Sequence, residues 1–400
     1  MAILGVWMWP TNVRVYGAEK VCAYCARAGV TDIYFLTKGL AGTTAFKGEI
    51  APAGYDYDLF AELLTAAHKK GIRVHAWFTS ACDEVYKKLY PESGRCHYTR
   101  GKDRELLSLS DAGYLSYMEK ITRELCRNYD VDGLHLDYIR YNHMVYGWDE
   151  ADIRRYEAEG ADIAHLRAMM DKAFLGDAPA GPEAIFDAYR AGDESVLAFA
   201  RARRKDVVHF ATALTKLAHA ERSDLILSAA LMPEGAYDDL AFSDVHYGQN
   251  YEDASKLYDY ALPMAYSQAY EKDASWVKMV AEGTMKRGMK TIMGLHAYEG
   301  GTGLTLKKDI AALKDTAIEG ICLFREGATA MAFAQDKKLE VYNTLEKPIT
   351  KVKATCGEQV FESAEEIAPG TEKQLQLPFA ADTLQVYCGE KETSVYLTQE

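Results

Sequence analysis

The chain has 400 residues, a length typical of two or three domains, although a single (β/α)8 barrel can take up most of it. Hydrophobic residues make up 48% of the chain and charged residues 26%; these ordinary globular values exclude disordered, collagen-like and coiled-coil classes. The net charge is −13 and no stretch is rich in Lys or Arg, so we expect neither a nucleic-acid partner nor binding to a membrane surface.

Eight short runs of apolar, β-branched or aromatic residues recur along the chain, with helical patterns between them. This alternation predicts an α/β fold with a parallel sheet, and eight strands favour a (β/α)8 TIM barrel over a doubly wound sheet. The predicted strands are 2–9, 32–37, 73–79, 133–139, 225–231, 260–266, 291–298 and 320–325. The predicted helices are 18–29, 58–71, 111–129, 196–221, 251–258, 273–288, 306–319 and a last one at 328–345.

Two segments depart from this regular repeat. The connection between strands 4 and 5 is far longer than one helix requires, so residues 141–195 are predicted to be a helical insertion, with helices within 152–174 and 182–189. Because the loop after a barrel strand opens at the catalytic face, we expect the insertion to wall or cover the site; a decorative or oligomerising subdomain is the alternative. After Pro348 the pattern changes to period two, which predicts a catalytic barrel over 1–346 and a small β domain over 347–400.

The sequence also bears on location and on the cysteines. No apolar run is long enough to cross a membrane, and the first predicted strand starts at Ala2, which leaves no room for a signal peptide. We therefore expect a cytoplasmic protein, or an exported one if an export signal has been trimmed from the chain. The eight cysteines form no metal-ligand pattern, and Cys22 and Cys25 are expected to be buried thiols. The sequence does not determine the oligomeric state.

The active site of a (β/α)8 barrel forms where its strands end at their C-terminal edge, so residues at and just beyond each strand end are the functional candidates. Carboxylates, aromatic rings and basic groups would meet on this rim. In chain order the candidates are Trp7, Trp9, Lys38, His75, Trp77, His135, Asp137, Arg140, Glu234, Tyr266, His296, Glu299, Arg325 and Glu326.

Asp137 is the leading catalytic candidate. It shares one face of strand 4 with Gly133 and His135, because side chains alternate along a strand. A carboxylate in a barrel mouth is costly to bury and needs partners such as His135, Lys38 or Arg140. The alternative interpretation is a structural salt bridge between Asp137 and Arg140.

A glycoside hydrolase needs two carboxyl groups, one as acid or acid/base and the other as nucleophile or base. Glu234 stands just past strand 5, next to strand 4 in the barrel, and is the favoured partner of Asp137. Glu299 follows strand 7 and would lie across the mouth, a placement used by retaining barrel glycosidases whose acid is on strand 4. Either glutamate could instead be a solvated loop carboxylate.

Three histidines raise the question of a metal, because imidazoles on neighbouring strands can bind zinc. Metal-dependent barrel hydrolases usually begin with His-x-His on strand 1, where this chain has Trp7 and Trp9, so we expect no metal and no other cofactor. Lys38 is expected to form an ion pair or to bind a hydroxyl group rather than to form a Schiff base.

The segment V-D-G-L-H-L-D-Y-I-R-Y at 131–141 resembles the signature of the family-10-like glycosyl hydrolases, (β/α)8 hydrolases that include bacterial cell-wall glycan hydrolases. Segments 33–52, 71–78, 199–210 and 244–266 are similar to further regions of that family. Over residues 3–330 the resemblance implies a carbohydrate-active enzyme. It places Asp137 at the catalytic position of strand 4, with His75, Trp77, Arg140 and Tyr266 around the sugar.

The sequence therefore predicts a glycoside hydrolase that cleaves O-glycosidic bonds in a neutral or amino-sugar-containing glycan. Asp137 would be the nucleophile or stabilising carboxylate, and Glu234 the acid/base. The rival prediction is a non-catalytic glycan-binding barrel whose carboxylates are structural. The expected sugar-contacting residues are Trp7, Trp9, Lys38, His75, Trp77, His135, Arg140, Tyr266, His296 and Arg325.

Overall fold

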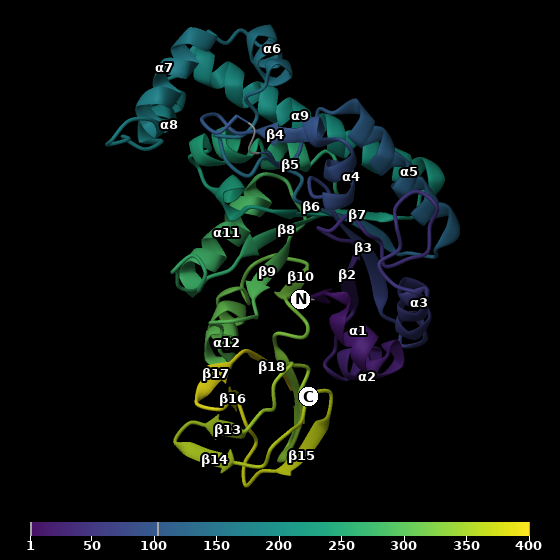
Figure 1. Cartoon of the computed structure of the whole chain (residues 1–400). Coiled ribbons are helices and arrows are strands. Elements are labelled where there is room, and N and C mark those ends of the chain that lie inside the picture. The colour runs from purple at the N-terminus through teal and green to yellow at the C-terminus, as the bar shows by residue number, and fades with distance from the viewer. Residues whose placement is uncertain (1, 102–103, 400) are drawn as a thin grey trace.

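The computed structural model describes residues 2–101 and 104–399 of the chain. Within these residues, eight parallel strands close into a barrel in the order β1-β10-β9-β8-β7-β6-β3-β2, with helices around it (Figure 1). The predicted TIM barrel is confirmed. Its strands are β1 (Ile3–Met8), β2 (Asp32–Lys38), β3 (Arg73–Thr79), β6 (Gly133–Asp137), β7 (Ile226–Leu231), β8 (Tyr260–Ala265), β9 (Ile292–His296) and β10 (Gly320–Phe324).

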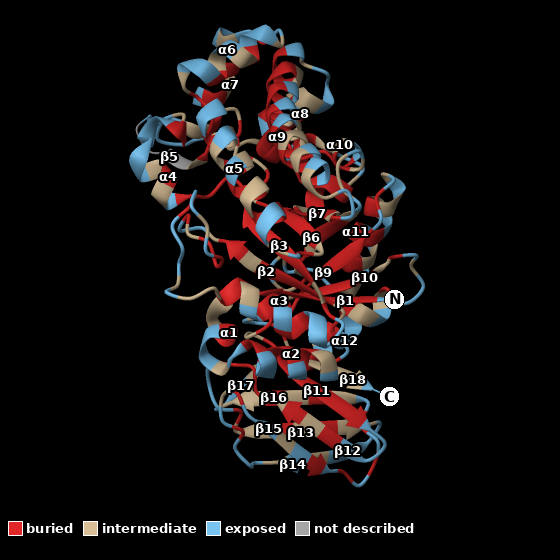
Figure 2. Ribbon diagram, turned by 90° about the vertical axis from the view of Figure 1, so that its right-hand side faces the viewer, coloured by how far each residue is buried: buried red, intermediate tan, exposed pale blue. Residues whose placement is uncertain are grey.

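The helices turn a buried stripe toward the strands and an exposed face toward solvent (Figure 2). Helices α3, α5, α9 and α11 each begin after an aspartate whose carboxylate accepts backbone N–H groups of the first turn. No helix in the described part of the chain combines the length and apolar character needed to cross a bilayer. The helices outside the insertion are α1 (Pro10–Tyr16), α2 (Ala18–Arg27), α3 (Leu59–Lys69), α4 (Glu84–Leu89), α5 (Ala112–Asn128), α9 (Glu194–Glu221), α10 (Tyr251–Ala254), α11 (Ala274–Lys286) and α12 (Gly303–Ala312), with short turns η1 (Pro91–Ser93), η2 (Pro233–Ala236) and η3 (Ser243–Tyr247).

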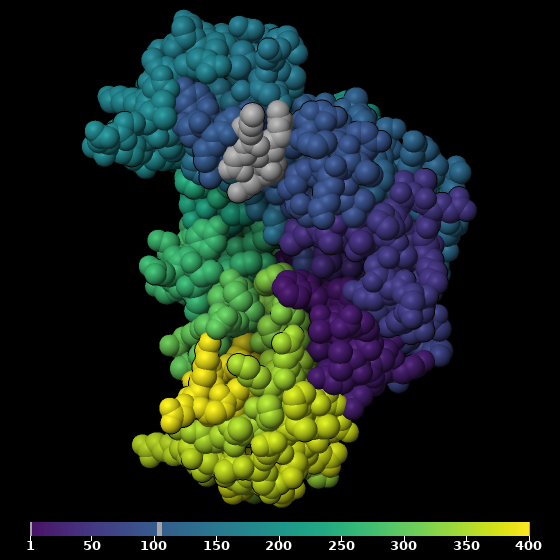
Figure 3. Space-filling view, in the orientation of Figure 1, coloured from purple at the N-terminus to yellow at the C-terminus, as the bar shows by residue number. Residues whose placement is uncertain are grey.

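The insertion after β6 folds as a separate helical layer at one end of the molecule (Figures 1 and 3). It contains α6 (Glu150–Ala158), α7 (Ile163–Phe174) and α8 (Glu183–Arg190), which pack on the first half of α9. Trp148, Tyr156 and Phe199 form the centre of its own apolar core. A further element that the sequence analysis did not predict is the antiparallel pair β4 (Gly94–Cys96) and β5 (Arg104–Leu107) in the loop after β3.

The C-terminal region is a β domain at the opposite end of the molecule (Figure 1), and its strands pair antiparallel except for β11 and β18, which are parallel. Two four-stranded sheets, in the orders β15-β12-β11-β18 and β14-β13-β16-β17, enclose a core of Ala, Leu, Ile and Val side chains. The strands are β11 (Ala330–Gln335), β12 (Lys338–Tyr342), β13 (Lys351–Cys356), β14 (Gln359–Ser363), β15 (Glu372–Gln376), β16 (Thr383–Cys388), β17 (Lys391–Thr393) and β18 (Val395–Gln399).

The predicted eighth helix at 328–345 is wrong, because β11 and β12 occupy these residues and pair with C-terminal strands. The β domain therefore begins near Ala330 rather than at residue 347. Alternation along β11 explains its two neighbours: Met331 joins the core of the barrel, whereas Ala332 and Ala334 face the core of the β domain. Contacts of β11 with α2 and of β16 and β18 with α12 place this domain where the eighth helix would otherwise pack.

Asp309 of α12 is a buried aspartate whose carboxylate accepts a hydrogen bond from the Ser267 hydroxyl at 2.6 Å. Burial raises the pKa of Asp309 to about 6, so the fold favours its protonated form and loses stability as pH rises from about 4 through 6. We expect Asp309→Asn to raise the free energy of unfolding by roughly 1 to 3 kcal/mol above pH 7, with no gain at pH 4. Urea unfolding at both pH values measures this difference, and an equal effect at both would contradict it.

Candidate active site

A cavity of about 310 Å3 opens at the C-terminal ends of the barrel strands. Its lining is mostly aromatic and apolar, and it contains one carboxylate, Asp137, and one guanidinium, Arg140. An apolar concave site with a few convergent polar groups is the usual form of a small-molecule site. The lining residues are Trp7, Trp9, Leu36, Leu40, Trp77, Thr79, Asp137, Tyr138, Arg140, Ala230, Met232, Met264, Tyr266, Tyr270 and Phe324.

Asp137 ends β6 at the base of this cavity and is 6% exposed. Its Oδ2 accepts the indole N–H of Trp77 at 3.1 Å, and its Oδ1 accepts the backbone N–H of Tyr138 at 2.6 Å. Burial raises the pKa of Asp137 to about 6, although these hydrogen bonds and the charge of Arg140 favour the ionised carboxylate. Among the described residues no ion pair joins Asp137 to Arg140; the carboxylate is held instead by the N–H groups of Trp77 and Tyr138.

The backbone beside Asp137 is unusual. Tyr138 has a φ of 53°, in the left-handed region that is costly for a bulky side chain. In this conformation the Tyr138 N–H reaches the Asp137 carboxylate, while the Ser80 N–H donates to the Asp137 carbonyl at 2.7 Å. The chain therefore turns sharply directly after Asp137. Strained backbone of this kind often occurs at functional sites.

Glu234 lies in η2, directly after β7, and is 8% exposed. Its Oε1 accepts the hydroxyl of Tyr270 at 3.3 Å, whereas its buried Oε2 has no hydrogen-bond partner among the described residues. Burial raises the pKa of Glu234, and Arg140 opposes this rise. Glu234 is not itself a lining residue, but its hydrogen-bond partner Tyr270 lines the cavity, as does Arg140. Glu234 therefore lies behind the lining, with its Oε2 unpaired among the described residues. The predicted pair of Asp137 and Glu234 is brought to one end of the barrel.

Glu299 lies apart from this cavity. Its side chain is 83% exposed and forms a 2.8 Å ion pair with Lys391 of β17, which lowers the pKa of Glu299. Lys391 of the β domain thus holds the Glu299 carboxylate at the surface, outside the lining of the cavity. The structure therefore does not support Glu299 as the second catalytic carboxyl group.

We expect Glu299→Gln to change kcat/KM by less than about twofold, because an exposed ion pair contributes little to stability and none of its atoms faces the cavity. Steady-state hydrolysis of a glycan cleaved by the wild-type chain measures this ratio. A loss of a hundredfold or more would restore Glu299 as a catalytic candidate.

The three candidate histidines are buried and none lines the cavity. His75 binds Asp32 at 2.8 Å, near the start of β2 and so at the opposite end of the barrel. His135 accepts the indole N–H of Trp7 at 3.0 Å, and burial holds the pKa of His135 well below its ordinary value, so it is neutral and fixes that ring. His296 stacks on Tyr298 and bonds to the Glu299 carbonyl. No group of three His, Cys, Asp or Glu side chains in the described residues could hold a metal ion.

Lys38 also lies outside the cavity. The register of β2 shifts between Leu36 and Lys38, so Leu36 lines the cavity while Lys38 turns to the outside of the barrel. There its ammonium pairs with Asp83 at 3.1 Å and bonds to the Cys82 carbonyl at 2.5 Å. The ion-pair alternative for Lys38 fits the structure, and its role as a sugar-binding residue does not.

Arg325 reaches the site indirectly. Its guanidinium lies 3.6 Å from the ring centre of Trp9, which lines the cavity, but Arg325 does not line it. Glu326 is buried beside Asn12 and Tyr24, away from the cavity. Sequence reasoning placed both residues at the rim because they follow strand 8.

Of the expected sugar-contacting residues, five line the cavity: Trp7, Trp9, Trp77, Arg140 and Tyr266. The sequence analysis missed the apolar part of the lining. Strand-end position alone could have suggested Phe324 and Leu36, but no signal singled out Tyr270, which lies in a loop beyond β8. None of the lining residues comes from the insertion at 141–195, so the insertion does not wall the cavity as expected; it packs on α9 instead.

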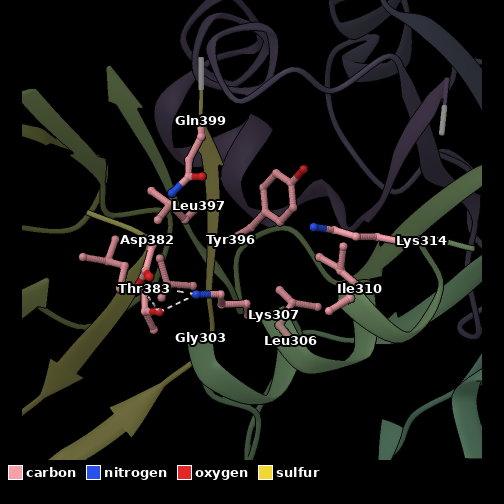
Figure 4. Close-up of a pocket in the computed structure, with 13 residues that line it drawn as sticks. Gly303, Leu306, Lys307, Ile310, Lys314, Asp382, Thr383, Tyr396, Leu397 and Gln399 are labelled. Carbon is pink, nitrogen blue, oxygen red and sulfur yellow. Dashed lines mark hydrogen bonds and ion pairs between the residues drawn. The ribbon is translucent and has the colours of Figure 1, made fainter. Parts of the chain in front are cut away.

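A second cavity, of about 220 Å3, lies between α12 and strands β16 and β18 (Figure 4). Tyr396 and Lys314 extend into the same space, and Lys307 bonds to Thr383 at 2.7 Å and pairs with Asp382 at 3.4 Å. Asp382 is the one carboxylate of this described lining and it is neutralised by a lysine. The cavity at the barrel mouth is therefore the candidate active site.

Comparisons with known proteins show the family of the chain and its fold. The family model for glycosyl hydrolase-like 10 matches residues 47–297, more than half of the chain. The chain belongs to the glycosyl hydrolase-like 10 family. For this family member, the matched range includes Asp137, Glu234, Trp77 and Tyr266, whereas Trp7, Trp9 and Glu299 lie outside it. No curated protein sequence matches the chain.

Solved structures similar to this glycosyl hydrolase-like 10 chain share its fold. The glycoside hydrolase domain of PgaB (BpsB) from Bordetella bronchiseptica has a TM-score of 0.64 at 14% identity, covering 82% of this chain and 94% of that one. The catalytic domain of β-amylase from Paenibacillus polymyxa has a TM-score of 0.57 at 11% identity, covering 81% and 92%. A β-galactosidase from Marinomonas ef1 has a TM-score of 0.59 at 13% identity; the match covers 81% of this chain but about half, 54%, of the β-galactosidase. The fold of this family member is thus similar to that of glycosidases.

Proposed function

We propose that the chain is a glycoside hydrolase that cleaves O-glycosidic bonds with Asp137 and Glu234. The observation that carries this proposal is a buried carboxylate, its pKa raised to about 6, at the base of an aromatic cavity in the barrel mouth. Membership of a glycoside hydrolase-like family supports the reaction class. The aromatic lining suits a sugar, because flat rings can pack against its apolar faces.

Asp137 is proposed as the nucleophile or stabilising carboxylate. Both of its oxygens accept N–H bonds, from Trp77 and from the Tyr138 backbone, and such bonds favour the ionised form. A fixed, ionised carboxylate stabilises the positive charge that develops at the anomeric carbon. Its hydrogen bonds hold it in place before the substrate binds.

Glu234 is proposed as the acid/base. Burial raises its pKa, which favours the protonated form that a general acid needs, and its Oε2 has no hydrogen-bond partner among the described residues. A general acid of this kind protonates the leaving-group oxygen as the glycosidic bond breaks. Tyr270 orients the other oxygen by its hydrogen bond.

Arg140 is proposed to bind sugar hydroxyl groups. It lines the cavity, and no carboxylate in the described residues pairs with its guanidinium. Its charge lowers the pKa of Asp137 and that of Glu234, so it limits the rise that burial imposes on both. Removing Arg140 would therefore disturb binding and protonation together.

A panel of glycans incubated with the chain tests the proposal by the release of reducing ends. The expected result is release from at least one neutral or amino-sugar-containing glycan, and none with Asp137→Asn. Binding without release, in the wild-type chain and the variant alike, would overturn hydrolysis and favour a non-catalytic glycan-binding barrel.

A further inference from the structure

The ladder between β6 and β7 ends before it reaches the two proposed catalytic carboxyl groups. The last paired residues are Leu136 and Ala229, and no later pair joins these two strands among the described residues. Ile139 and Met232 each lie three residues further along, so a ladder continued in the same register would set them opposite each other. Backbone pairing between β6 and β7 therefore does not fix the two loops that follow them relative to each other.

The side chain of Gln249 takes the place of the missing pair. Its Oε1 accepts the backbone N–H of Met232 at 2.9 Å, and its Nε2 donates to the carbonyl of Ile139 at 3.2 Å. These partners determine the orientation of the amide, because a backbone N–H only donates and a carbonyl only accepts. Gln249 is 2% exposed, so both bonds are shielded from water. One side-chain amide thus joins the loop after β6 to the loop after β7.

Both hydrogen bonds lie close to the proposed catalytic residues. Ile139 is two residues after Asp137, and Met232 is two residues before Glu234. Met232 lines the cavity, whereas Gln249 does not. Gln249 therefore does not touch a substrate in the cavity, and its contacts act on the positions of Asp137 and Glu234.

The segment around Gln249 is itself held in place. Gly248 has a φ of 61°, and a Cβ atom there would lie 2.9 Å from the backbone of α9, so only glycine fits. Two residues after Gln249, the Tyr251 hydroxyl donates to the carbonyl of Met232 at 2.7 Å. Side chains from one short segment therefore hold both the N–H and the carbonyl of Met232.

We propose that Gln249, assisted by Tyr251, is a positioning residue that sets the distance between the carboxyl groups of Asp137 and Glu234. This inference rests on the proposed hydrolase function. The two carboxyl groups flank the glycosidic bond that is cleaved, and a misplacement of about 1 Å can lower the rate about 100-fold. Loss of the amide should therefore slow bond cleavage much more than it weakens substrate binding.

Gln249→Met tests this role, because methionine keeps the length of the side chain but has neither the amide donor nor its strong acceptor. On glycosides that the wild-type chain cleaves, kcat should fall about 10-fold to 100-fold while KM stays within about threefold. The fall should be similar for leaving groups that need protonation and for those that do not, because the separation of both carboxyl groups changes.

Asn343→Leu is the matched control. Asn343 is 1% exposed and also joins backbone segments, because it accepts the N–H of Leu345 at 3.0 Å and donates to the carbonyl of Ile367 at 2.7 Å. It belongs to the β domain and does not line the cavity. This variant should lower the melting temperature as Gln249→Met does, but should leave kcat within about twofold of the wild-type value. Equal losses of kcat in both variants, or a loss in Gln249→Met that falls on KM, would overturn the proposal.

Hydrogen exchange followed by mass spectrometry provides a readout that needs no activity. In Gln249→Met, exchange should become faster in both 137–141 and 231–236, whereas Asn343→Leu should leave both segments unchanged. Unchanged exchange in either segment of Gln249→Met overturns the proposal. If the wild-type chain hydrolyses no glycan, the proposed function fails by itself, and exchange alone decides whether Gln249 joins the two loops.

Tyr251→Phe provides a second variant in case Gln249→Met does not fold. It removes one hydroxyl group and keeps the ring, so the bond to the Met232 carbonyl is lost without a change of packing. A fall in kcat of about threefold or more at unchanged KM, with faster exchange in 231–236, supports the proposal. Unchanged kcat and unchanged exchange overturn it.

Discussion

We expect Asp137→Asn to lose at least about a thousandfold in kcat/KM on every glycan that the wild-type chain cleaves. The amide cannot supply the negative charge that opposes the developing charge at the anomeric carbon. One amide oxygen can still accept the Trp77 N–H, so the variant should fold and bind glycan. Reducing-end kinetics, with circular dichroism for the fold, measure both effects.

The same residue determines one side of the pH profile. The pKa of Asp137 is raised to about 6 by burial, and its ionised form is the active one. The value of kcat/KM in the wild-type chain should therefore have a rising limb as pH increases through about 6, and this limb belongs to Asp137. A profile of kcat/KM that is flat from pH 4 to 7, or that falls across this range, would contradict the proposal that Asp137 acts as an ionised carboxylate.

Asp309→Asn is the matched control for Asp137→Asn. Both aspartates are buried and both have a pKa raised to about 6, but Asp309 accepts a hydrogen bond from Ser267, in the loop after β8, and does not line the cavity. The control should change stability with pH and leave kcat/KM within about twofold of the wild-type value. If Asp137→Asn retained activity within tenfold, or if both variants lost it equally, Asp137 would not be the catalytic carboxylate.

The barrel could be predicted from the sequence because each strand is short, apolar and separated by an amphipathic helical pattern. Alternation along strand 4 also placed Asp137 on the inner face, since Gly133, His135 and Asp137 share it. Alternation along a strand does not predict how far along the barrel axis each inward-facing side chain lies. His135 and Asp137 are two residues apart, yet His135 is fully buried under Trp7 and Asp137 reaches the cavity.

Three other differences have local physical causes. A register shift in β2 turns Lys38 to the outside of the barrel, and a prediction based on strict alternation cannot detect such a shift. Residues 328–345 were predicted as the helix that completes the eighth βα unit, but in β11 the small side chains Ala332 and Ala334 pack in the core of the β domain. Glu299 was assigned to the mouth, but its partner Lys391 lies 92 residues away, beyond the reach of local patterns.

We expect Glu234→Gln to lose about 100-fold to 10,000-fold in kcat on glycosides whose leaving group needs protonation. Glutamine keeps the size of the side chain and can still accept the Tyr270 hydroxyl, but it has no proton to transfer. On aryl glycosides with an acidic phenol as leaving group the loss should be much smaller, because such a group departs as an anion. This dependence separates Glu234 from Asp137, whose loss should be similar for every leaving group.

The pH profile provides a second test of Glu234. Burial raises its pKa, and a general acid acts while protonated, so kcat/KM of the wild-type chain should fall as pH rises through that pKa. The variant should lack this falling limb on activated aryl glycosides and keep the rising limb that belongs to Asp137. Glu299→Gln, which removes a carboxylate outside the cavity, should keep both limbs. If Glu234→Gln kept both limbs and lost equally on all leaving groups, Glu234 would be a structural residue, and the proton would have to come from another group at the mouth.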